Sequence, residues 1–515
     1  MGYSGELPPE RFNMAEYVIG RAARREPDKP ALLVYDDAEA EAPHETWTYA
    51  EIERAVLGIA GALQASGLER GDRLIIRLDN TSTYALLFFG AIAAGMVPLA
   101  TSTHLSEDEA AFLAADSGAR AVALADHLPH PDRDSGVRAI PAGDVAAMIR
   151  SAGLARYADT RADDPAYMVY TSGTTASPKG VLHAQRAAWG RRPMYQGWYG
   201  IGPGDRMLHA GAFNWTFTLG TGLTDPWANG ATSIIFTGTR DSGLWPRLIS
   251  RTGATLFAAV PGVYRQMLKY AAPDDLARLD TLRHGLMAGE TPPAALFDEW
   301  RAATRLELHE ALGMSEISTY VSTAPGVPRR AGTVGRAQPG RAIAILPEED
   351  GETPLPPGET GLLAVHRSDP GLMLGYWRRP QEESAVMRGD WFVGGDLASI
   401  DADGYVTHRG RADDIMKALG YRVAPQEVEA VLARHPAVAE VACAERHVRA
   451  DVTVIAAYVV PRVFASAPDP HVLTSYAAEH LAPYKCPREI IYVPALPRTA
   501  NGKVLRRVLE ELYPR

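Results

Sequence analysis

The stretch from residue 167 to residue 183, YMVYTSGTTASPKGVLH, decides how this chain is organised. Its apolar start, Tyr167 to Tyr170, predicts a short buried strand. A loop follows whose side chains are mostly hydroxyls, with glycines and one lysine: Thr171, Ser172, Gly173, Thr174, Thr175, Lys179 and Gly180. Main-chain N–H groups and hydroxyls of such a loop can donate to phosphate oxygens, and Lys179 can follow the leaving phosphates as a mobile charge. The loop therefore predicts a polyphosphate site.

The order of these residues is more informative than their composition, because a plain surface connection would also be rich in Ser, Thr and Gly. The Walker A pattern is excluded, since no Gly-x-x-x-x-Gly-Lys-Ser/Thr can be drawn through the loop. The loop instead resembles the phosphate-loop signature of the adenylate-forming enzymes, which include acyl-CoA synthetases, adenylation domains of peptide synthetases, and luciferases. The resemblance extends from about residue 14 to residue 508.

Composition limits the function classes that fit. Hydrophobic residues make up 46% and charged residues 22%, as in ordinary globular chains, and the formal net charge of −10 argues against a general nucleic-acid binder. Cys443 and Cys486 form no C-x-x-C pair, which favours a reducing cytoplasm without structural disulfide or zinc. The first residues lack a signal sequence, and the uncharged stretch 84–100 is too short for a membrane span. We expect a cytoplasmic protein in which residues 84–100 form a buried helix leading into a strand.

The pattern of apolar residues predicts an α/β fold. Helical stretches such as 49–66 alternate with strand-like runs such as 73–77 and 121–124, which indicates parallel sheets covered by helices. From residue 341 proline and glycine become dense and short strands follow, whereas the last segment mixes helices with strands.

The resemblance implies a division of the chain into a large and a small domain. The large N-terminal domain would hold two layered αβ subdomains and a small β-barrel-like subdomain, and a small mobile α+β domain would follow through a hinge at Asp413. The expected bounds are 1–412 for the N-terminal domain, about 14–340 for the αβ subdomains, about 341–412 for the β subdomain, and 413–515 for the C-terminal domain.

The resemblance also implies an ATP site. Small residues would lie against adenine, hydroxyls and Lys179 would hold phosphates, and a carboxylate would accept hydrogen bonds from the ribose hydroxyls. The residues are Thr171, Ser172, Gly173, Thr174, Thr175, Lys179, Ala288, Gly289, Glu290, Leu312, Gly313, Ser315, Asp396 and Arg411. Leu312 stands where the family has an aromatic residue that stacks on adenine. Glu316 would bind Mg²⁺ through a hard carboxylate oxygen.

Catalysis would depend on Lys503, Glu316 and Lys179. By resemblance, Lys503 bridges the substrate carboxylate and the α-phosphate in the first step and leaves the cleft when the C-terminal domain rotates about Asp413. The face that replaces it would carry the CoA-side residues Lys417, Gly420, Tyr421 and Arg422. The resemblance further suggests that acetylation of Lys503 removes the charge that the first step needs.

The acyl pocket is predicted from an aromatic-rich segment, residues 209 to 218. Phe213, Trp215 and Phe217 alternate, so on a strand they would share a face, although core packing explains the pattern equally well. The further pocket candidates are Val260, Gly262, Met314 and Tyr320. A pocket crowded with rings limits depth and favours an aryl or short-to-medium-chain acid. The combination is more similar to benzoate-type and medium-chain ligases than to long-chain ones.

The predicted activity is that of an ATP-dependent carboxylate–CoA ligase that forms acyl-AMP, releases pyrophosphate, and transfers the acyl group to CoA. The alternatives are a stand-alone adenylase that loads a carrier protein and a nucleotide-binding homologue without turnover. No carrier domain follows Lys503 before Arg515, so free CoA is preferred. The expected partners are the acid, ATP and CoA, without nucleic acid or an integral membrane contact. Two further interactions are left open: formation of a homodimer, and modification of Lys503 by a lysine acetyltransferase and deacetylase.

Overall fold

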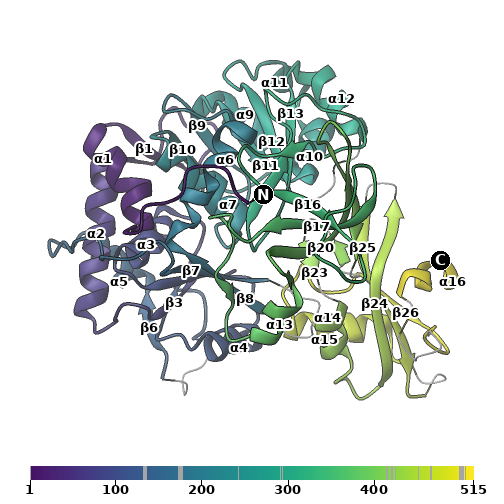
Figure 1. Ribbon diagram of the computed structural model, residues 1–515. Coiled ribbons are helices and arrows are strands. Elements are labelled where there is room, and N and C mark those ends of the chain that lie inside the picture. Colours follow the sequence, from purple (N-terminus) through teal and green to yellow (C-terminus); the bar gives the residue numbers. More distant parts are fainter. Residues whose placement is uncertain are drawn as a thin grey trace.

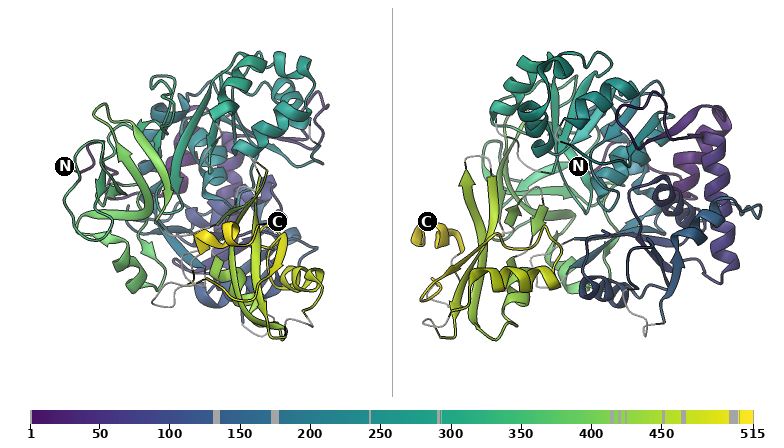
Figure 2. Two further views of the ribbon diagram at one scale, coloured as in Figure 1. Left: turned by 90° about the vertical axis from the view of Figure 1, so that its right-hand side faces the viewer. Right: turned by 180° about the vertical axis from the view of Figure 1, so that it is seen from behind.

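The structure is a computed structural model of the full chain, and Figures 1 and 2 show a main body with a smaller C-terminal lobe against one side. It describes residues 2–130, 136–171, 178–241, 243–289, 292, 294–412, 416–418, 421–423, 425–449, 452–463, 467–497, 504 and 506–514. We call residues 2–412 the main body and the described residues from 416 to 514 the C-terminal lobe. Among the described residues, no helix combines the length and apolar character needed to cross a bilayer.

The first sheet of the main body carries the phosphate loop. Its strand order is β18-β8-β7-β4-β3-β5-β6, parallel from β7 to β6 and antiparallel at β8 and β18. The strands are β3 (Arg73–Arg77), β4 (Val97–Ala100), β5 (Ala121–Leu124), β6 (Arg138–Pro141), β7 (Pro165–Thr171), β8 (Lys179–Ala184) and β18 (Gly375–Tyr376). Their main helices are α2 (Tyr49–Ala65), α3 (Ser82–Ala93), α4 (Glu107–Ser117) and α5 (Ala142–Ile149). The predicted strand before the loop and the buried helix that leads into a strand are therefore confirmed.

Local sequence explains why these helices begin where they do. Thr48 caps α2, since its hydroxyl accepts from the Glu51 N–H while the Glu51 carboxylate accepts from Thr48. Ser106 and Glu109 form the same capping box at the start of α4, which fixes the direction of both side chains.

The second sheet of the main body is larger and mixed. Its order is β15-β14-β13-β12-β11-β9-β10-β1-β2, with parallel pairing from β13 to β1 and antiparallel edges. The strands are β1 (Pro30–Tyr35), β2 (Glu45–Thr48), β9 (Arg206–His209), β10 (Thr232–Phe236), β11 (Leu256–Ala259), β12 (His284–Ala288), β13 (Leu308–Met314), β14 (Ser318–Ser322) and β15 (Arg336–Ala337). The associated helices are α1 (Arg21–Arg25), α6 (Arg192–Met194), α7 (Thr216–Thr218), α8 (Asp225–Ala228), α9 (Leu244–Thr252), α10 (Pro261–Tyr270), α11 (Pro273–Ala277) and α12 (Ala294–Thr304).

A third, antiparallel sheet follows in the part of the chain where short strands were predicted. It contains β16 (Ile343–Leu346), β17 (Thr360–His366), β19 (Met387–Arg388), β20 (Trp391–Ile400) and β21 (Val406–Arg411), with α13 (Pro380–Ala385) between them. A buried ion pair anchors the start of this region, because Arg341 and Asp369 are both fully buried at 2.7 Å and Arg341 also donates to the Gly190 carbonyl. The curled β subdomain that the sequence predicts is therefore present.

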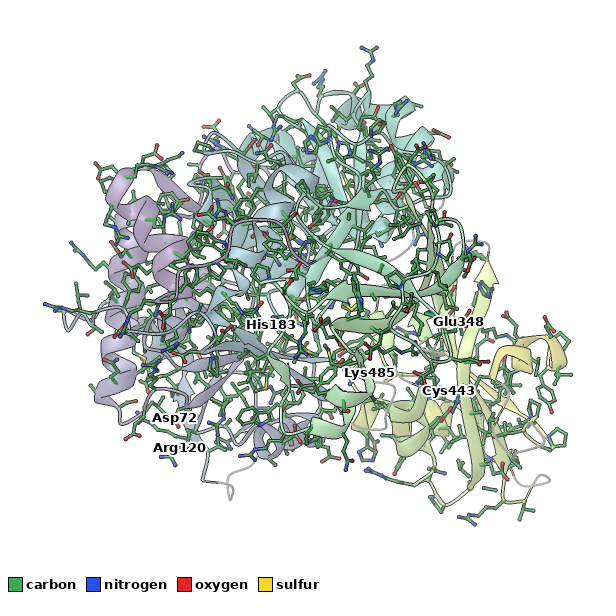
Figure 3. All side chains as sticks on the ribbon, viewed as in Figure 1. Asp72, Arg120, His183, Glu348, Cys443 and Lys485 are labelled. Atoms are coloured by element: carbon green, nitrogen blue, oxygen red, sulfur yellow. The ribbon has the colours of Figure 1, made fainter. Side chains whose placement is uncertain are left out.

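The C-terminal lobe is a small α+β unit, as predicted. It consists of β22 (Met416–Ala418), β23 (Tyr421–Val423), α14 (Pro425–Leu432), β24 (Val438–Arg449), β25 (Val452–Pro461), α15 (Pro470–His480), β26 (Glu489–Tyr492) and α16 (Leu509–Leu512). Residues of α14 and α15 pack with Ile455 and Ala457 of β25, whereas Leu509 and Val504 pack with Ala456 and Tyr458 of the same strand. Because side chains alternate along a strand, Val504 and Leu509 lie on the sheet face opposite α14 and α15. Cys443 is buried inside this lobe, and Lys485 lies where the lobe meets the main body (Figure 3).

Candidate active site

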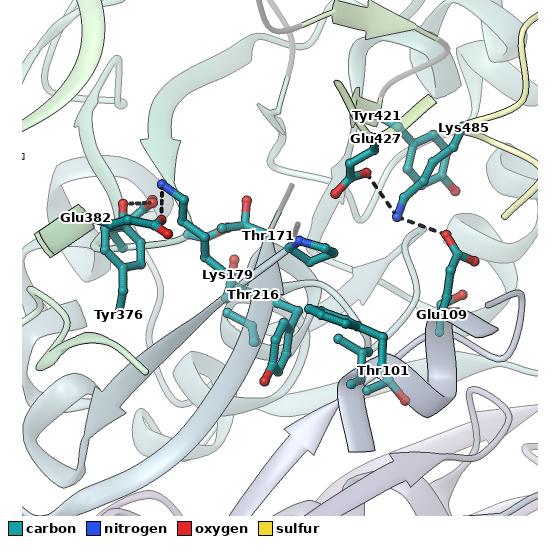
Figure 4. A pocket seen from close by; sticks show the side chains of 18 of the residues that line it. Thr101, Glu109, Thr171, Lys179, Thr216, Tyr376, Glu382, Tyr421, Glu427 and Lys485 are labelled. Atoms are coloured by element: carbon teal, nitrogen blue, oxygen red, sulfur yellow. Dashed lines mark hydrogen bonds and ion pairs between the residues drawn. The ribbon is translucent and has the colours of Figure 1, made fainter. Parts of the chain in front are cut away.

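A cavity of about 760 Å³ lies between the main body and the C-terminal lobe (Figure 4). The main body contributes residues at the ends of β4 and β7, at the start of β8, and along α4, α13 and β20, and the lobe contributes β23, α14, α15 and the segment after α15. Of the predicted site residues, Thr171, Lys179, Trp215, Ser315, Glu316 and Tyr421 line it. Segments far apart in the sequence therefore meet at one partly open cavity.

The phosphate-loop side of the cavity is built on a hairpin. β7 and β8 pair so that Thr171 lies opposite Lys179, and the predicted phosphate ligands between them, Ser172, Gly173, Thr174 and Thr175, lie outside the described residues. Lys179 Nζ is 2.5 Å from Glu382 Oε2 of α13 and 5.2 Å from the centre of the Tyr376 ring. The Tyr376 hydroxyl donates to Glu316 Oε1 at 2.8 Å. Tyr376, which lies beside Lys179 in Figure 4, thus links that lysine to Glu316.

The residues expected around adenine lie on two neighbouring strands. Ala288 ends β12, and it pairs in register with Ala311 of β13, just before Leu312 and Gly313. Gly289 adopts a φ of 97°, which favours glycine, whereas a Cβ at Gly313 would lie 2.5 Å from the Ser318 carbonyl oxygen. Gly313 is therefore needed for the close approach of β14. Glu290 lies outside the described residues.

The expected ribose carboxylate, Asp396, is 4% exposed on β20. It pairs across the sheet with Arg411 of β21, and its Oδ1 is 3.1 Å from His408 Nε2. The cavity is lined by Gly394, Gly395 and Ala412 next to these two residues, rather than by Asp396 itself. The side chain of Arg411 is outside the described part of the structure.

The proposed shared face of the aromatic segment is wrong, because β9 ends at His209 and residues 216–218 form α7. The three rings do not lie on one common face, although Trp215 and Phe217 contact each other at 6.5 Å. Phe213 packs on Tyr84 at 5.6 Å, and Phe217 packs between Trp198 and His209. Of the three, only Trp215 lines the cavity, and its ring tip lies beside the position that a Gly289 Cβ would take. A turn that enters a helix does not keep the period of two that the prediction assumed.

The other acyl-pocket candidates do not line this cavity. Val260 caps α10 and lies beside Gly289, with Gly262 in the first turn of that helix. Met314 ends β13 with its side chain against Gly394, and Tyr320 is fully buried on β14. They surround the ends of β11, β12 and β13, and their assignment to the acyl group stays a prediction.

The C-terminal lobe places aromatic rings across the boundary between the two bodies. Tyr421 stacks on Trp215 at 6.1 Å and on Tyr484 at 4.1 Å, and burial raises the pKa of Tyr484 to about 12. Lys417 and Arg422 pair through their backbones in the β22–β23 hairpin, although the structure does not describe their side chains. Gly420, Asp413 and Lys503 lie outside the described residues.

Several cavity residues were not predicted from the sequence. They are Tyr376 and Glu382 beside Lys179, and Glu109, Glu427, Tyr484 and Lys485 at the boundary of the lobe. The capping box makes Glu109 the third residue of α4, but no local pattern in the sequence indicates that a lysine 376 positions later contacts it.

The fold and cavity define a class of two-lobed α/β proteins whose site lies between the lobes and offers a lysine and hydroxyl groups to a ligand. The comparisons narrow the class. The family described as "AMP-binding enzyme" matches residues 19–377, and "AMP-binding enzyme C-terminal domain" matches residues 427–503. The chain belongs to the AMP-binding, or adenylate-forming, enzyme family.

Similar sequences and structures agree with this membership. The chain is 28% identical to 3-hydroxybenzoate–CoA/4-hydroxybenzoate–CoA ligase of Thauera aromatica, with 98% of both chains covered, and 31% identical to benzoate–CoA ligase of the same organism, with 97% and 95% covered. A double mutant of o-succinylbenzoate CoA synthetase from Bacillus subtilis, bound with a CoA product analogue, superimposes with a TM-score of 0.86, 26% identity, and 98% and 99% coverage. An anthranilate CoA ligase in complex with anthranoyl-AMP gives 0.72 at 26% identity, with 98% of both chains covered.

Proposed function

We propose that this protein is an acid–thiol ligase that converts an aryl or short-to-medium-chain carboxylic acid into its CoA thioester. In the first step a carboxylate oxygen attacks the α-phosphorus of ATP, the bond to the bridging oxygen breaks, and pyrophosphate leaves. In the second step the CoA sulfur attacks the acyl carbon of acyl-AMP, the thiol proton is lost, and AMP leaves. Both steps depend on positioning and on neutralising charge as it moves.

The assigned roles follow the geometry of the cavity. Thr171, Ser315 and Lys179 are suited to hold phosphate oxygens, because they lie on one wall and offer donors. Asp396 and Arg411 are assigned to the ribose, and Ala288 and Gly289 to adenine. Lys503 is assigned to the first step, and Asp413 to the hinge between domains 1–412 and 413–515.

Mg²⁺ is the metal that the donor set fits. Within the described part of the chain no three His, Cys, Asp or Glu side chains gather as ready-made metal ligands, but Glu316 faces the phosphate-loop side of the cavity. Magnesium is commonly held by one or two carboxylates together with substrate phosphates, so Glu316 alone suffices from the protein. When bound, the ion would neutralise charge on the phosphates.

The orientation of the C-terminal lobe is the observation that carries the proposal of a CoA acceptor. The TM-score is 0.86 against the complex with a CoA product analogue and 0.72 against the complex with an acyl-adenylate, at the same identity of 26%. Val504, next to the assigned catalytic Lys503, packs on the sheet face of the lobe opposite α14 and α15, which line the cavity. Both observations support a lobe turned for the second step, with Tyr421 at the cavity.

The choice of an aryl acid rests on two supports. The relatives named above act on benzoate and hydroxybenzoates by their names, and Trp215 reduces the room beside Gly289. We further propose a cytoplasmic location. A homodimer, and acetylation of Lys503 by an acetyltransferase that a deacetylase reverses, also belong to this proposal.

The test is a screen of carboxylic acids with ATP and Mg²⁺, in which pyrophosphate and AMP are measured with and without CoA. We expect aryl acids to give pyrophosphate alone at low yield and AMP with acyl-CoA when CoA is added. Long-chain acids as the best substrates would contradict the substrate class. A requirement for an added carrier protein in place of CoA would contradict the acceptor.

A further inference from the structure

Three charged side chains join the C-terminal lobe to the main body beside the cavity, and we call them the interdomain charge cluster: Glu109, Glu427 and Lys485. Lys485 Nζ lies 3.1 Å from Glu109 Oε1 of α4 and 3.2 Å from Glu427 Oε2 of α14 (Figure 4). Glu109 belongs to the main body, whereas Lys485 and Glu427 belong to the lobe. One lysine of the lobe thus has one carboxylate partner on each side of the boundary.

Further contacts hold the same two surfaces together. The Ser106 hydroxyl donates to the His480 carbonyl at 3.2 Å, so the first turn of α4 meets the last turn of α15. Tyr484, which precedes Lys485 in the chain, stacks on Tyr421 at 4.1 Å. The segment that contacts α4 therefore also supports the ring that faces the cavity.

Burial strengthens the two ion pairs of the interdomain charge cluster. The side chains of Lys485, Glu109 and Glu427 are 8%, 14% and 4% exposed. Burial acts to lower the pKa of Lys485, but the carboxylates of Glu427 and Glu109 outweigh it and raise that pKa, whereas burial raises the pKa of Glu427. The lysine is thus charged and shielded from water, where ion pairs interact more strongly than at an exposed surface.

The two ion pairs differ in what a movement of the lobe does to them. The pair of Lys485 with Glu427 lies within the lobe and travels with it. The pair with Glu109 crosses the boundary, so any rotation that carries Lys485 away from α4 breaks it. An interaction present in one orientation and absent in the others shifts the population toward that orientation by its own free energy.

We propose that Glu109 is a positioning residue for the thioester-forming step, and that its ion pair with Lys485 holds the C-terminal lobe in the orientation that presents Tyr421 to Trp215 and the cavity. The inference rests on the proposed two-step reaction, because it gives the two orientations different tasks. Glu109 touches neither acid nor nucleotide in this role. It acts through the lobe.

The decisive variant is Glu109→Gln, because glutamine can keep the capping box of α4 while it removes the charge. We expect the single-turnover transfer of an acyl group from pre-made acyl-AMP to CoA to slow by about tenfold, between the effects of exposed and buried ion pairs. Pyrophosphate release in the absence of CoA should be unchanged or faster. A Glu109→Asp variant, which keeps the charge, should recover part of the second rate.

Glu107→Gln is the matched control, since Glu107 is an exposed residue in the same turn of α4. Equal effects of Glu109→Gln and Glu107→Gln on acyl transfer would overturn the proposal. An equal loss of both half-reactions in Glu109→Gln would also overturn it, because it would indicate general damage rather than a shifted orientation.

A second measurement separates the failure of this inference from the failure of the proposed function. Leu154 in the main body and Val472 in the lobe are both about half exposed, so fluorophores attached to Leu154→Cys and Val472→Cys report the distance between the two bodies. The background carries Cys486→Ser, and the remaining native cysteine, Cys443, is fully buried. Glu109→Gln should lengthen or broaden that distance, and an unchanged distribution would refute the role of Glu109 even in a protein that activates no acid. Absence of pyrophosphate release from the unmodified protein would refute only the proposed function.

Discussion

Glu382 should weaken the binding of ATP, because it forms an ion pair with Lys179, the lysine that we assign to the phosphates of ATP. Lys179 Nζ is 2.5 Å from Glu382 Oε2, and Arg379 approaches the other oxygen at 3.8 Å. A triphosphate that reaches Lys179 must displace or share this carboxylate and also approach its negative charge. We therefore expect Glu382→Gln to lower the KM for ATP.

The size of the effect follows from how far the pair is buried. The side chains of Lys179 and Glu382 are 10% and 24% exposed, so the pair lies between the exposed and buried regimes. Exposed pairs contribute up to about 1 kcal/mol and broken buried pairs cost about 3–5 kcal/mol, which suggests about 1.5–2 kcal/mol here. That free energy corresponds to a roughly tenfold to thirtyfold lower KM for ATP, since about 1.4 kcal/mol is a factor of ten.

Pyrophosphate release at varied ATP and saturating acid measures the effect, and inhibition by added pyrophosphate should become stronger in the same variant. Glu383→Gln is the control, because Glu383 is the next residue of α13 and Lys179 pairs with its neighbour. An unchanged or higher KM for ATP in Glu382→Gln, or an equal change in Glu383→Gln, would refute the reasoning.

Three further predictions concern catalysis and stability. Lys503→Ala should abolish pyrophosphate release but preserve much of the thioester formation from pre-made acyl-AMP, and equal loss of both would refute its assignment. Asp369→Asn should lower the free energy of unfolding by about 3 kcal/mol, because it leaves Arg341 buried beside a neutral partner; urea denaturation measures this, and Asp390→Asn, in an exposed pair, should change it little. Burial raises the pKa of Glu310 from 4.5 to about 7. Its contribution to the free energy of unfolding is therefore present below pH 4.5 and is lost as the pH rises to 7. Glu310→Gln should make the urea denaturation midpoint less dependent on pH over that range.

The sequence predicts the fold well where the signal is local. Apolar runs bounded by turn residues identified β3 and β5 with their observed bounds, and the helical pattern from residue 49 located α2 to within one residue at its end. Such segments bury whole faces, so periodicity and burial agree. The prediction for the aromatic segment failed because this agreement between periodicity and burial is absent there. Its alternation predicts a strand, whereas Phe213 packs on Tyr84 and only Trp215 and Phe217 contact each other.

The site is only partly predictable because its charges are balanced across long sequence distances. Motifs identified Lys179 and Glu316, which lie on the cavity, but they could not identify the partners of these residues. Glu382 and Lys485 occur in segments without a distinctive pattern, and their roles depend on which helix the fold brings beside them. A residue whose function is to neutralise another residue leaves no local signature of its own.

Glu382 and Glu109, whose roles the sequence did not predict, both suit the stage of the proposed reaction that follows pyrophosphate release. In the orientation seen here Lys179 is paired with Glu382 and Lys485 with Glu109, so each of these two lysines on the cavity wall has a carboxylate within about 3 Å. In the proposed reaction, Lys179 would otherwise remain charged and poorly hydrated beneath the lobe once pyrophosphate has left, which is costly in a shielded site. In the proposed reaction, Glu382 of the main body would replace that anion for Lys179, and Glu109 would supply a carboxylate to Lys485 of the lobe. The lobe can therefore dock after pyrophosphate has left, because each of Lys179 and Lys485 then has a carboxylate partner and neither is buried as an unpaired charge.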